Sequence, residues 1–454
     1  MNKRLISLIF AGILLLLCLV PPVGMLIAGP AEAGANEVLA FAPGLKTRDG
    51  TLNTAFLSDC ADYLADRFFP RQEAITAWNA LNAALGASGS PSVVLGRDGW
   101  LYYADTLPDY AGSAPKTDRA LWCAARTLLL MQEYAGEQGS DFVFFIAPNK
   151  NSLYPEHMPA SVPVRSGESD AARFSALLNE MGVNNLDLRA LLAAESDTLY
   201  FKTDSHWTTR GAALGADGLL NALGRESGFY TAGFSVPGSH TGDLYSMLYP
   251  AGTETEDDPQ PDTPFTFTYV RPIRGVDDIR IETVCENAGG ELLMFRDSFG
   301  NSLYPFLAES FGKAAFSRLT SYDLTMLNPG AALCVELVER NLGYLNTYAP
   351  VLPAPERKLT GLISGVEATP FATVEKSSLD GCVKLTGTLP LPADTDSPVY
   401  LCAADGRLYE AFPSPDGFAA HIPAGLLNAL TLVYSSDGRL IETGLIRCEN
   451  TISD

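Results

Sequence analysis

Short apolar runs of strand-forming residues alternate with helical stretches through the middle of the chain, and this alternation restricts the fold more than any other feature. The expected strands are residues 142–147, 186–188, 198–201, 292–295 and 333–338, and the expected helices are residues 117–138, 209–223 and 300–311. Such an alternation predicts a mainly parallel sheet with helices on both faces. Sheets of this kind place their chemistry at the carboxyl ends of the strands.

The segments on either side of this alternation have a different character. An amphipathic helix is expected at about residues 58–85 and a short hairpin at residues 93–103. Residues 358–454 show short alternating strands separated by Asp-Gly turns, which predicts a small β-sandwich. The predicted domains are a signal anchor or signal peptide at residues 1–35, an α/β domain at residues 36–352, and a hinge with the β-sandwich at residues 353–454.

An uncharged apolar stretch opens the chain. Lys3 and Arg4 precede the Leu-rich residues 5–31, which are long enough to cross a bilayer. This pattern predicts export, and the length favours an uncleaved single-pass anchor in the cell membrane with an extracytoplasmic body. Cleavage after the small residues of Ala31-Glu32-Ala33 is the alternative and would give a secreted protein.

The composition excludes several classes of protein. The chain has 454 residues, with 31 Lys and Arg against 53 Asp and Glu, and this net charge of −22 argues against a nucleic-acid partner. Its eight cysteines include no CxxC pair and no Cys/His pair at zinc spacing. We therefore predict no metal and no cofactor. The acidic residues 251–264 have the composition of an exposed loop, and a calcium-binding loop is the alternative.

A histidine motif falls between an expected strand and an expected helix, in Thr203-Asp204-Ser205-His206-Trp207-Thr208. A carboxylate two residues before a histidine can bond one ring nitrogen and leave the other free to act as a base. The alternative is that His206 caps the helix or packs beside Trp207. The catalytic hypothesis therefore needs a nucleophile from another part of the chain.

Ser298 is the candidate nucleophile, because it also lies where an expected strand passes into a helix. Backbone N–H groups at the start of such a helix can hold an oxyanion. The alternative is that Ser298 is a helix N-cap. Because both motifs lie at strand-to-helix transitions of one sheet, we predict that Ser298, His206 and Asp204 form a triad.

This combination resembles the DHHW proteins and the alginate O-acetyltransferase-like branch of the SGNH hydrolase superfamily. Those extracytoplasmic proteins have an Asp-x-His-Trp loop upstream of a serine in a Gly-Asp-Ser-like turn. The likeness spans roughly residues 40–350, with Ser205 at the second position of the DHHW signature and Arg296 where an SGNH enzyme commonly has Gly. The segments that carry it further are residues 66–71, 96–102, 147–150, 154–155 and 336–341.

The resemblance implies an SGNH-hydrolase-like fold in which Ser298 is the nucleophile, His206 the base and Asp204 its orienting carboxylate. Six further residues are candidates for substrate binding or the oxyanion hole: Lys150, Asn149, Tyr154, Trp207, Arg318 and Asn341. Each has a structural alternative, such as a solvated lysine, a core tryptophan or a surface arginine. No role is assigned to His157, His240 or His421.

The predicted function is that of an extracytoplasmic O-acetyltransferase that acts on a cell-surface or secreted polysaccharide. The alternatives are a carbohydrate esterase (deacetylase) of the same fold and a non-catalytic glycan-binding or scaffold protein. A transferase of this kind needs a membrane-bound, multi-span partner that delivers the acyl donor. The sequence leaves open the direction of the reaction, the glycan, and whether the C-terminal β-domain binds sugar or only packs.

Overall fold

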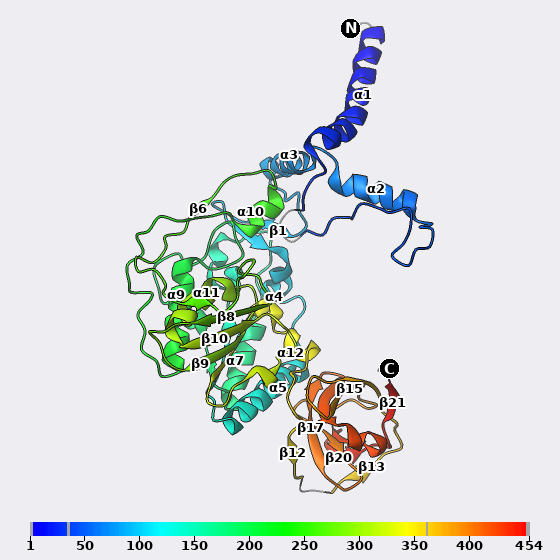
Figure 1. Ribbon diagram of the computed structural model, residues 1–454, viewed down its shortest axis with the longest axis vertical. Coiled ribbons are helices and arrows are strands. Elements are labelled where there is room, and N and C mark those ends of the chain that lie inside the picture. Colours follow the sequence, from blue (N-terminus) through cyan, green and yellow to red (C-terminus); the bar gives the residue numbers. More distant parts are fainter. Residues whose placement is uncertain (1–2, 34–36, 360–361, 451–454) are drawn as a thin grey trace.

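The computed structural model describes residues 3–33, 37–359 and 362–450. Figure 1 shows an N-terminal helix that projects from an α/β body, with a β-rich region at the opposite end. The predicted domain boundary between residues 35 and 36 lies outside the described residues. The predicted boundary at residues 352–353 falls between the short helix α12 (Tyr344–Thr347) and β12 (Glu356–Arg357), and it stays a prediction.

Within the described residues, a seven-stranded sheet forms the centre of the body. In sheet order its strands are β4 (Asn185–Leu186), β3 (Phe142–Ala147), β11 (Ala332–Val338), β9 (Glu291–Phe295), β10 (Lys313–Ser317), β8 (Arg280–Val284) and β7 (Thr268–Tyr269). The first five pair in parallel, whereas β8 and β7 pair antiparallel at one edge. The predicted α/β class is confirmed, and the sheet is mixed where the sequence predicted a mainly parallel one.

The strand expected at residues 198–201 is wrong. Tyr200 makes only an isolated bridge with Trp207, and the N–H of Thr208 donates to the carbonyl of Leu199 at 2.8 Å. The chain therefore turns back on itself here and does not join the sheet. Three true strands, β10, β8 and β7, were missed; β10 reads Lys-Ala-Ala-Phe-Ser, which has little of the β-branched composition that marks a strand.

Helices cover both faces of the sheet, as the alternation predicts. On one face lie α8 (Leu188–Ala193), α9 (Thr209–Ala222) and α11 (Gly300–Ser310), and on the other lie α5 (Asp118–Glu137) and α7 (Asp170–Glu180). Successive side chains of a strand point to opposite faces. Val143 and Phe145 of β3 accordingly pack in the core on the α9 and α11 side of the sheet, and Phe142 and Phe144 pack in the core on the α5 and α7 side. The expected helices of the body are confirmed to within two residues at each end.

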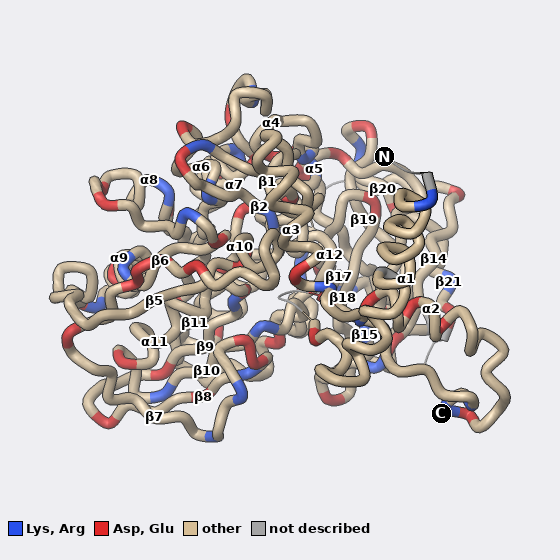
Figure 2. Tube along the Cα trace, turned by 90° about the horizontal axis from the view of Figure 1, so that it is seen from above, with Lys and Arg blue, Asp and Glu red and all other residues tan. Residues whose placement is uncertain are grey.

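The N-terminal region contains α1 (Lys3–Ala28), α2 (Phe56–Arg67), α3 (Arg71–Ala84) and the hairpin of β1 (Val93–Leu95) and β2 (Leu101–Tyr103). The single helix expected at residues 58–85 is two helices, because Pro70 lacks an N–H and the chain at Phe68 is extended. Figure 2 shows α1 without charge beyond its first turn, and residues 4–28 form an apolar helix long enough to cross a membrane.

The remaining elements of the body are short. They are α4 (Leu107–Ala111), α6 (Lys150–Leu153), α10 (Asp243–Leu248), β5 (Ser239–His240) and β6 (Glu256–Asp257). The loop expected at residues 251–264 is largely irregular, although β6 lies within it and pairs with β5. This pairing places His240 and the start of α10 beside the loop that carries His206.

The predicted β-rich C-terminal region is present. Its strands are β12, β13 (Ser364–Gly365), β14 (Phe371–Lys376), β15 (Cys382–Thr388), β16 (Val399–Cys402), β17 (Leu408–Ser414), β18 (Gly417–Pro423), β19 (Thr431–Ser436), β20 (Arg439–Glu442) and β21 (Arg447–Asn450). In the described residues they form one hydrogen-bonded path that runs through β17, where the sequence predicted a sandwich. The Asp-Gly turns are confirmed; Asp437 and Gly438 both have positive φ, of 50° and 71°, as a two-residue hairpin turn requires.

A buried carboxylate fixes this β-rich region to α5. Glu410 of β17 is fully buried and accepts hydrogen bonds from Arg126 at 2.6 and 2.7 Å and from Arg357 at 2.7 Å. Two turns earlier on α5, Arg119 donates to three backbone carbonyls of residues 394, 395 and 397. Because buried charges are stable only when paired, these contacts hold the two parts of the chain in one arrangement.

We predict that Glu410→Ala lowers the free energy of unfolding by about 1.5–3 kcal/mol, because the partly buried guanidinium groups of Arg126 and Arg357 lose the carboxylate they share and keep only Glu133. Urea unfolding of the full chain measures this loss. Asp405→Ala is the control, since Asp405 forms a solvent-exposed pair with Arg407 and its removal should change the unfolding midpoint little. Equal midpoints for the two variants would contradict the role of Glu410.

Candidate active site

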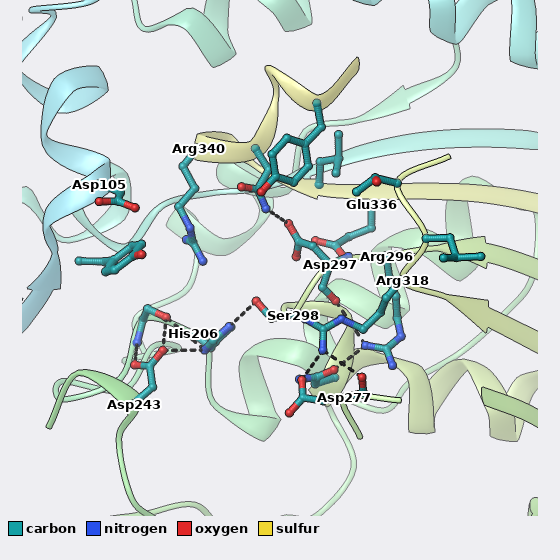
Figure 3. Close-up of a pocket in the computed structure, with 18 of the residues that line it drawn as sticks. Asp105, His206, Asp243, Asp277, Arg296, Asp297, Ser298, Arg318, Glu336 and Arg340 are labelled. Carbon is teal, nitrogen blue, oxygen red and sulfur yellow. Dashed lines mark hydrogen bonds and ion pairs between the residues drawn. The ribbon is translucent and has the colours of Figure 1, made fainter. Parts of the chain in front are cut away.

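A cleft of about 1040 Å³ lies at the carboxyl ends of β9, β10 and β11 (Figure 3). These strands run in parallel register, so the segments that follow them reach the same edge of the sheet. The cleft is lined by Tyr103, Asp105, Ser205, His206, Asp243, Met247, Asp277, Arg296, Asp297, Ser298, Asn301, Arg318, Leu319, Thr320, Tyr322, Glu336, Leu337, Arg340, Asn341 and Tyr344. The location agrees with the edge that the sequence predicts for chemistry.

The structure brings Ser298, His206 and Asp204 into one hydrogen-bonded chain. The Oγ of Ser298 lies 2.8 Å from Nε2 of His206, and Nδ1 of His206 lies 2.7 Å from Oδ1 of Asp204. The backbone N–H of His206 donates to the same carboxylate oxygen at 2.8 Å. This arrangement leaves Nε2 of His206 as the nitrogen that can exchange a proton with the serine.

Neither Ser298 nor His206 acts as a helix cap, which was the structural alternative for each. The N-cap of α11 is Phe299, whose N–H is bonded by the carboxylate of Asp297 at 3.0 Å, so the hydroxyl of Ser298 does not cap the helix. The N-cap of α9 is Thr208, so His206 does not cap that helix either. Both side chains are therefore available to each other in the cleft.

A network beneath Ser298 fixes its turn to β11. The other carboxylate oxygen of Asp297 accepts from the N–H of Val338 at 2.9 Å and from the side chain of Asn341 at 2.8 Å. The N–H of Asp297 donates to Glu336, a fully buried residue whose pKa is raised well above its ordinary value by burial and by the nearby Asp297. Asn341 lines the cleft as expected, but the bond from its amide nitrogen is directed to Asp297.

Trp207 joins the His206 loop to the Ser298 turn from below. Its side chain is fully buried, its Nε1–H donates to the carbonyl of Phe299 at 3.1 Å, and its ring packs edge-on against Phe299. The expectation that Trp207 binds substrate is wrong, because no face of the indole is exposed. The core alternative is the correct one.

Lys150 lies beneath the same loop and not in the cleft. Its Nζ donates to the carbonyls of Phe201 at 3.1 Å, Lys202 at 2.8 Å and Asp204 at 2.5 Å. Burial lowers the pKa of Lys150 to about 7, while three carbonyl acceptors match the three protons of the ammonium form. The expectation that Lys150 binds substrate is wrong, since its ammonium donates to three backbone carbonyls in the loop before His206.

Tyr154 and Asn149 also lie behind the cleft. The hydroxyl of Tyr154 accepts from the N–H of Leu199 at 2.8 Å, and its ring packs against Trp100, so the expectation that it lines the cleft is wrong. Asn149 is buried and its N–H donates to Glu339 at 2.7 Å. It does not line the cleft, and among the described residues its side-chain amide has no hydrogen-bond partner. The oxyanion role expected for Asn149 therefore has no support in this geometry.

Arg318 and Arg296 form one wall of the cleft (Figure 3). Arg318 lines the cleft as expected, and its guanidinium already forms an ion pair with the carboxylate of Asp277. Arg296, which stands where an SGNH enzyme commonly has Gly, is buried and donates to Asn301 and to the carbonyl of Val276. Burial lowers its pKa to about 10.

Two residues missed by the sequence analysis complete the surroundings of Asp204. Nε2 of His240 lies 2.8 Å from Oδ2 of Asp204, and the backbone N–H of Asp243 donates to the same oxygen at 2.8 Å. Burial alone raises the pKa of Asp204, but bonds from both imidazoles outweigh burial and hold its pKa well below the ordinary value. The bond to Asp204 in turn raises the pKa of His240. No short spacing links His240 to Asp204, so the sequence could not pair them.

Ser205, the departure from the DHHW signature, holds Asp243 beside the imidazole. Its Oγ and N–H donate to the two carboxylate oxygens of Asp243 at 2.6 and 2.7 Å, and Asp243 lies 3.6 Å from Nδ1 of His206. The close approach needs Gly242, where a Cβ would lie 2.2 Å from the carbonyl oxygen of Thr203. Asp204, His206 and Asp243 are close enough to hold a metal ion, but these hydrogen bonds already account for their grouping.

Arg340 is a further residue missed by the sequence analysis. It lines the cleft between the rings of Tyr103 and Phe299, and Figure 3 shows its guanidinium on the side of His206 and Ser298. Among the described residues it has no ion-pair partner within 4.0 Å. The other two unassigned histidines lie outside the cleft: His157 pairs with Asp98, and His421 bonds Ser377.

Comparisons with known proteins bear on the same region. Residues 93–276 match the family described as SGNH hydrolase-like domain, acetyltransferase AlgX. The predicted resemblance is confirmed. The expectation of an enzyme domain is confirmed with it. The part that matches AlgX includes Asp204, His206, His240 and Asp243 and ends before Ser298.

Individual relatives carry related names. The probable alginate O-acetylase AlgJ of Pseudomonas syringae pv. tomato is 29% identical over 225 residues, which are 48% of this chain and 52% of that protein. The chain thus spans about half the length of the curated relatives it matches. Among solved structures, the O-acetyltransferase domain of Pseudomonas putida AlgJ covers 56% of this chain and 92% of that domain, with TM-score 0.36 and 18% identity. A DHHW family protein from Eubacterium siraeum covers 57% of this chain and 99% of its own, with TM-score 0.40 and 17% identity.

We predict that Lys150→Met increases hydrogen exchange of the amides at residues 201–207 by about tenfold or more, because leaving even one buried carbonyl without a donor costs about 1–3 kcal/mol. Exchange followed by mass spectrometry measures the effect on the full chain. Lys202→Met is the matched control, since Lys202 is an exposed neighbour on the same loop. Equal protection in the two variants would contradict the role of Lys150.

A second prediction concerns pH. Because the folded-state pKa of His240 is raised above 6.5, its contribution to stability is complete below pH 6.5 and is lost as the pH rises through the raised value. His240→Gln should therefore destabilise the chain more at about pH 5.5 than at about pH 8.5 in urea unfolding.

His421→Gln provides a control of opposite sign. Burial lowers the pKa of His421 to about 4, so the unfolded state binds more protons in the acidic range and the contribution of His421 to stability falls with falling pH. A pH trend for His240→Gln in the same direction as for His421→Gln would contradict the assigned bond to Asp204.

Proposed function

We propose that this chain is an extracytoplasmic O-acetyltransferase that uses Ser298, His206 and Asp204 to acetylate a cell-surface or secreted polysaccharide. The observation that carries the proposal is the continuous hydrogen-bonded chain from Asp204 through His206 to Ser298 at the edge of an open cleft. The SGNH-like match of residues 93–276 and the name of the AlgJ relatives support acetyl transfer to a polysaccharide.

In the proposed reaction, Nε2 of His206 takes the proton of Ser298 as Oγ attacks the carbonyl carbon of the acyl donor. The tetrahedral oxyanion forms near the N-terminus of α11, where the helix dipole favours negative charge. The imidazolium then gives its proton to the leaving group, and Ser298 carries the acetyl ester. Asp204 stabilises the imidazolium at Nδ1 throughout.

The second half of the reaction repeats these steps with a sugar hydroxyl. His206 takes the proton of the hydroxyl, the sugar oxygen attacks the acetyl ester, and Ser298 is released with its proton restored from His206. Arg340 projects into the cleft without a carboxylate partner among the described residues, so its guanidinium suits an acidic group on the acceptor. Water at the same position would give acetate, which is the esterase alternative.

The same proposal includes a place in the cell. The apolar helix α1 is long enough to cross a membrane, and its most apolar residues are not buried against the rest of the protein. We therefore propose that it anchors the body at the extracytoplasmic face. A membrane-bound, multi-span acyltransferase would supply the acetyl donor. Its product, an activated acetyl group outside the membrane, is the reagent that Ser298 needs.

We predict that Ser298→Ala and His206→Ala each reduce hydrolysis of p-nitrophenyl acetate by the detergent-solubilised full chain about a thousandfold or more, because removal of either member disables the nucleophile. Ser302→Ala, in the first turns of α11, is the matched serine control and should retain activity. A sulfonyl fluoride should label Ser298 in the wild type and not in His206→Ala, as read by peptide mass.

The acceptor reaction separates the alternatives. Acetylated polysaccharide that depends on Ser298 identifies a transferase, whereas release of acetate that no acceptor diminishes identifies an esterase. A folded wild-type chain that neither hydrolyses the ester nor takes the label would contradict the catalytic proposal and favour the glycan-binding alternative.

A further inference from the structure

Helix α3 presents a row of apolar side chains to the outside of the protein. Trp78, Leu81 and Leu85 are 60%, 57% and 78% exposed, and with the exposed Ala74 they recur at intervals of three and four residues. This spacing places them on one face of the helix. We call Ala74, Trp78, Leu81 and Leu85 the outer stripe of α3. A soluble protein rarely leaves such a face in water, so it marks a contact surface.

The opposite face of α3 already packs on the body. Asn79 is buried, and its side-chain amide donates to the carbonyl of Leu248 at the end of α10 at 2.6 Å. No charged residue occurs from Ala74 to Gly96. Beyond its first turn, which contains Arg71 and Glu73, the helix is therefore fixed on its inner side by the protein and is apolar and uncharged on its outer side.

Helix α3, which carries the outer stripe, starts at the point where α1 meets the body. A Cβ on Gly24, one turn before the end of α1, would lie 2.1 Å from the ring of Phe69, which shows that this ring packs against the helix backbone. The guanidinium of Arg67 donates to the carbonyl of Ala31 at 3.0 Å, and the N–H of Ala31 donates back to the carbonyl of Arg67 at 3.1 Å. Phe69 belongs to the link between α2 and α3, so both helices begin or end at the exit of α1.

The direction of α2 and α3 fits this position. In Figure 1 both helices run across the axis of α1, on either side of its lower end. If α1 spans a bilayer, helices that cross its axis at its end run along the membrane surface. Further exposed apolar side chains gather in the neighbouring segment; they are Val38, Phe41, Leu45, Leu52, Leu57 and Leu64.

We propose that the outer stripe of α3 is a membrane-surface contact, with Trp78 in the headgroup region of the bilayer that α1 spans. The occupant of the stripe is lipid. Tryptophan prefers the boundary between headgroups and acyl chains, and an apolar helix face that lies along this boundary binds by the area it buries. Because the stripe carries no charge, zwitterionic lipid suffices. This proposal rests on the membrane anchor proposed for α1 and is independent of the catalytic role of Ser298.

The test uses the full chain in phosphatidylcholine vesicles with a spin-labelled lipid that quenches tryptophan fluorescence. The expected result is strong quenching by a label at the headgroup or the upper acyl chain and weaker quenching by a label near the chain end. Trp78→Phe should lose this quenching and Trp122→Phe should retain it, because Trp122 lies on α5, away from α1. Trp78 is exposed, so its replacement by Phe leaves the packed face of α3 intact.

Two outcomes would overturn the proposal, and they are distinguishable. If the chain does not float with the vesicles in a density gradient, the anchor itself fails and the stripe has no membrane beside it. If the chain floats but Trp78→Phe and wild type are quenched equally, α1 is inserted and the outer stripe is not in lipid. Neither result depends on catalytic activity, so the proposed enzyme function is tested separately.

Discussion

The bond from the indole N–H of Trp207 to the carbonyl of Phe299 joins two loops that are far apart in the sequence, and the candidate site depends on it. Trp207 follows His206 and Phe299 follows Ser298, so one buried bond sets the spacing of the reactive pair. A fully buried indole has one donor and must use it. The distance between His206 and Ser298 therefore depends on how the core packs on the α9 and α11 side of the sheet.

The floor of the site contains ionisable groups in places where burial alone is unfavourable. Lys150, Asp204, Glu336 and Glu339 are all buried, and burial raises the pKa of Glu339 to about 7. Each has polar partners: carbonyls for Lys150, imidazoles for Asp204, and backbone N–H groups for the two glutamates. These hydrogen bonds offset the cost of burying the charged or polar groups. They also fix the backbone, because each bond holds a backbone N–H or carbonyl group at a defined place relative to the side chain.

Local patterns explain which parts of this arrangement the sequence could predict. The run at residues 142–147 and the strand-to-helix positions of His206 and Ser298 are local features, and the structure places the two side chains together. The alternation of apolar strand-like runs with helical stretches predicted the helices of the body. His240 and Arg340 were missed because their contacts with the site come only from the tertiary fold. Lys150 and Trp207 were misplaced because the same residue types serve a cleft or a core, and only packing decides.

The antiparallel edge shows a second limit of the same kind. β8 reads Arg-Ile-Glu-Thr-Val, and every second residue is buried, as in a strand with one face on the core, but it is too short to stand out from the loops around it. Its pairing with β10 becomes evident only when β10 is in place. The C-terminal turns, by contrast, were readable because Asp-Gly pairs favour a backbone that few other residues adopt.

The short helix α10 acts as a spacer of fixed length. Its first residue, Asp243, is bonded to Ser205 beside the imidazole, and its last residue, Leu248, is held by Asn79 of α3. Six helical residues span about 9 Å. With α3 on a bilayer, the nucleophile would be held at a constant height above the lipid, and only polymer passing through that thin layer would be modified. The distance of the nucleophile from the membrane, more than the affinity of the cleft, would then decide which molecules of an extracellular polymer receive acetyl groups.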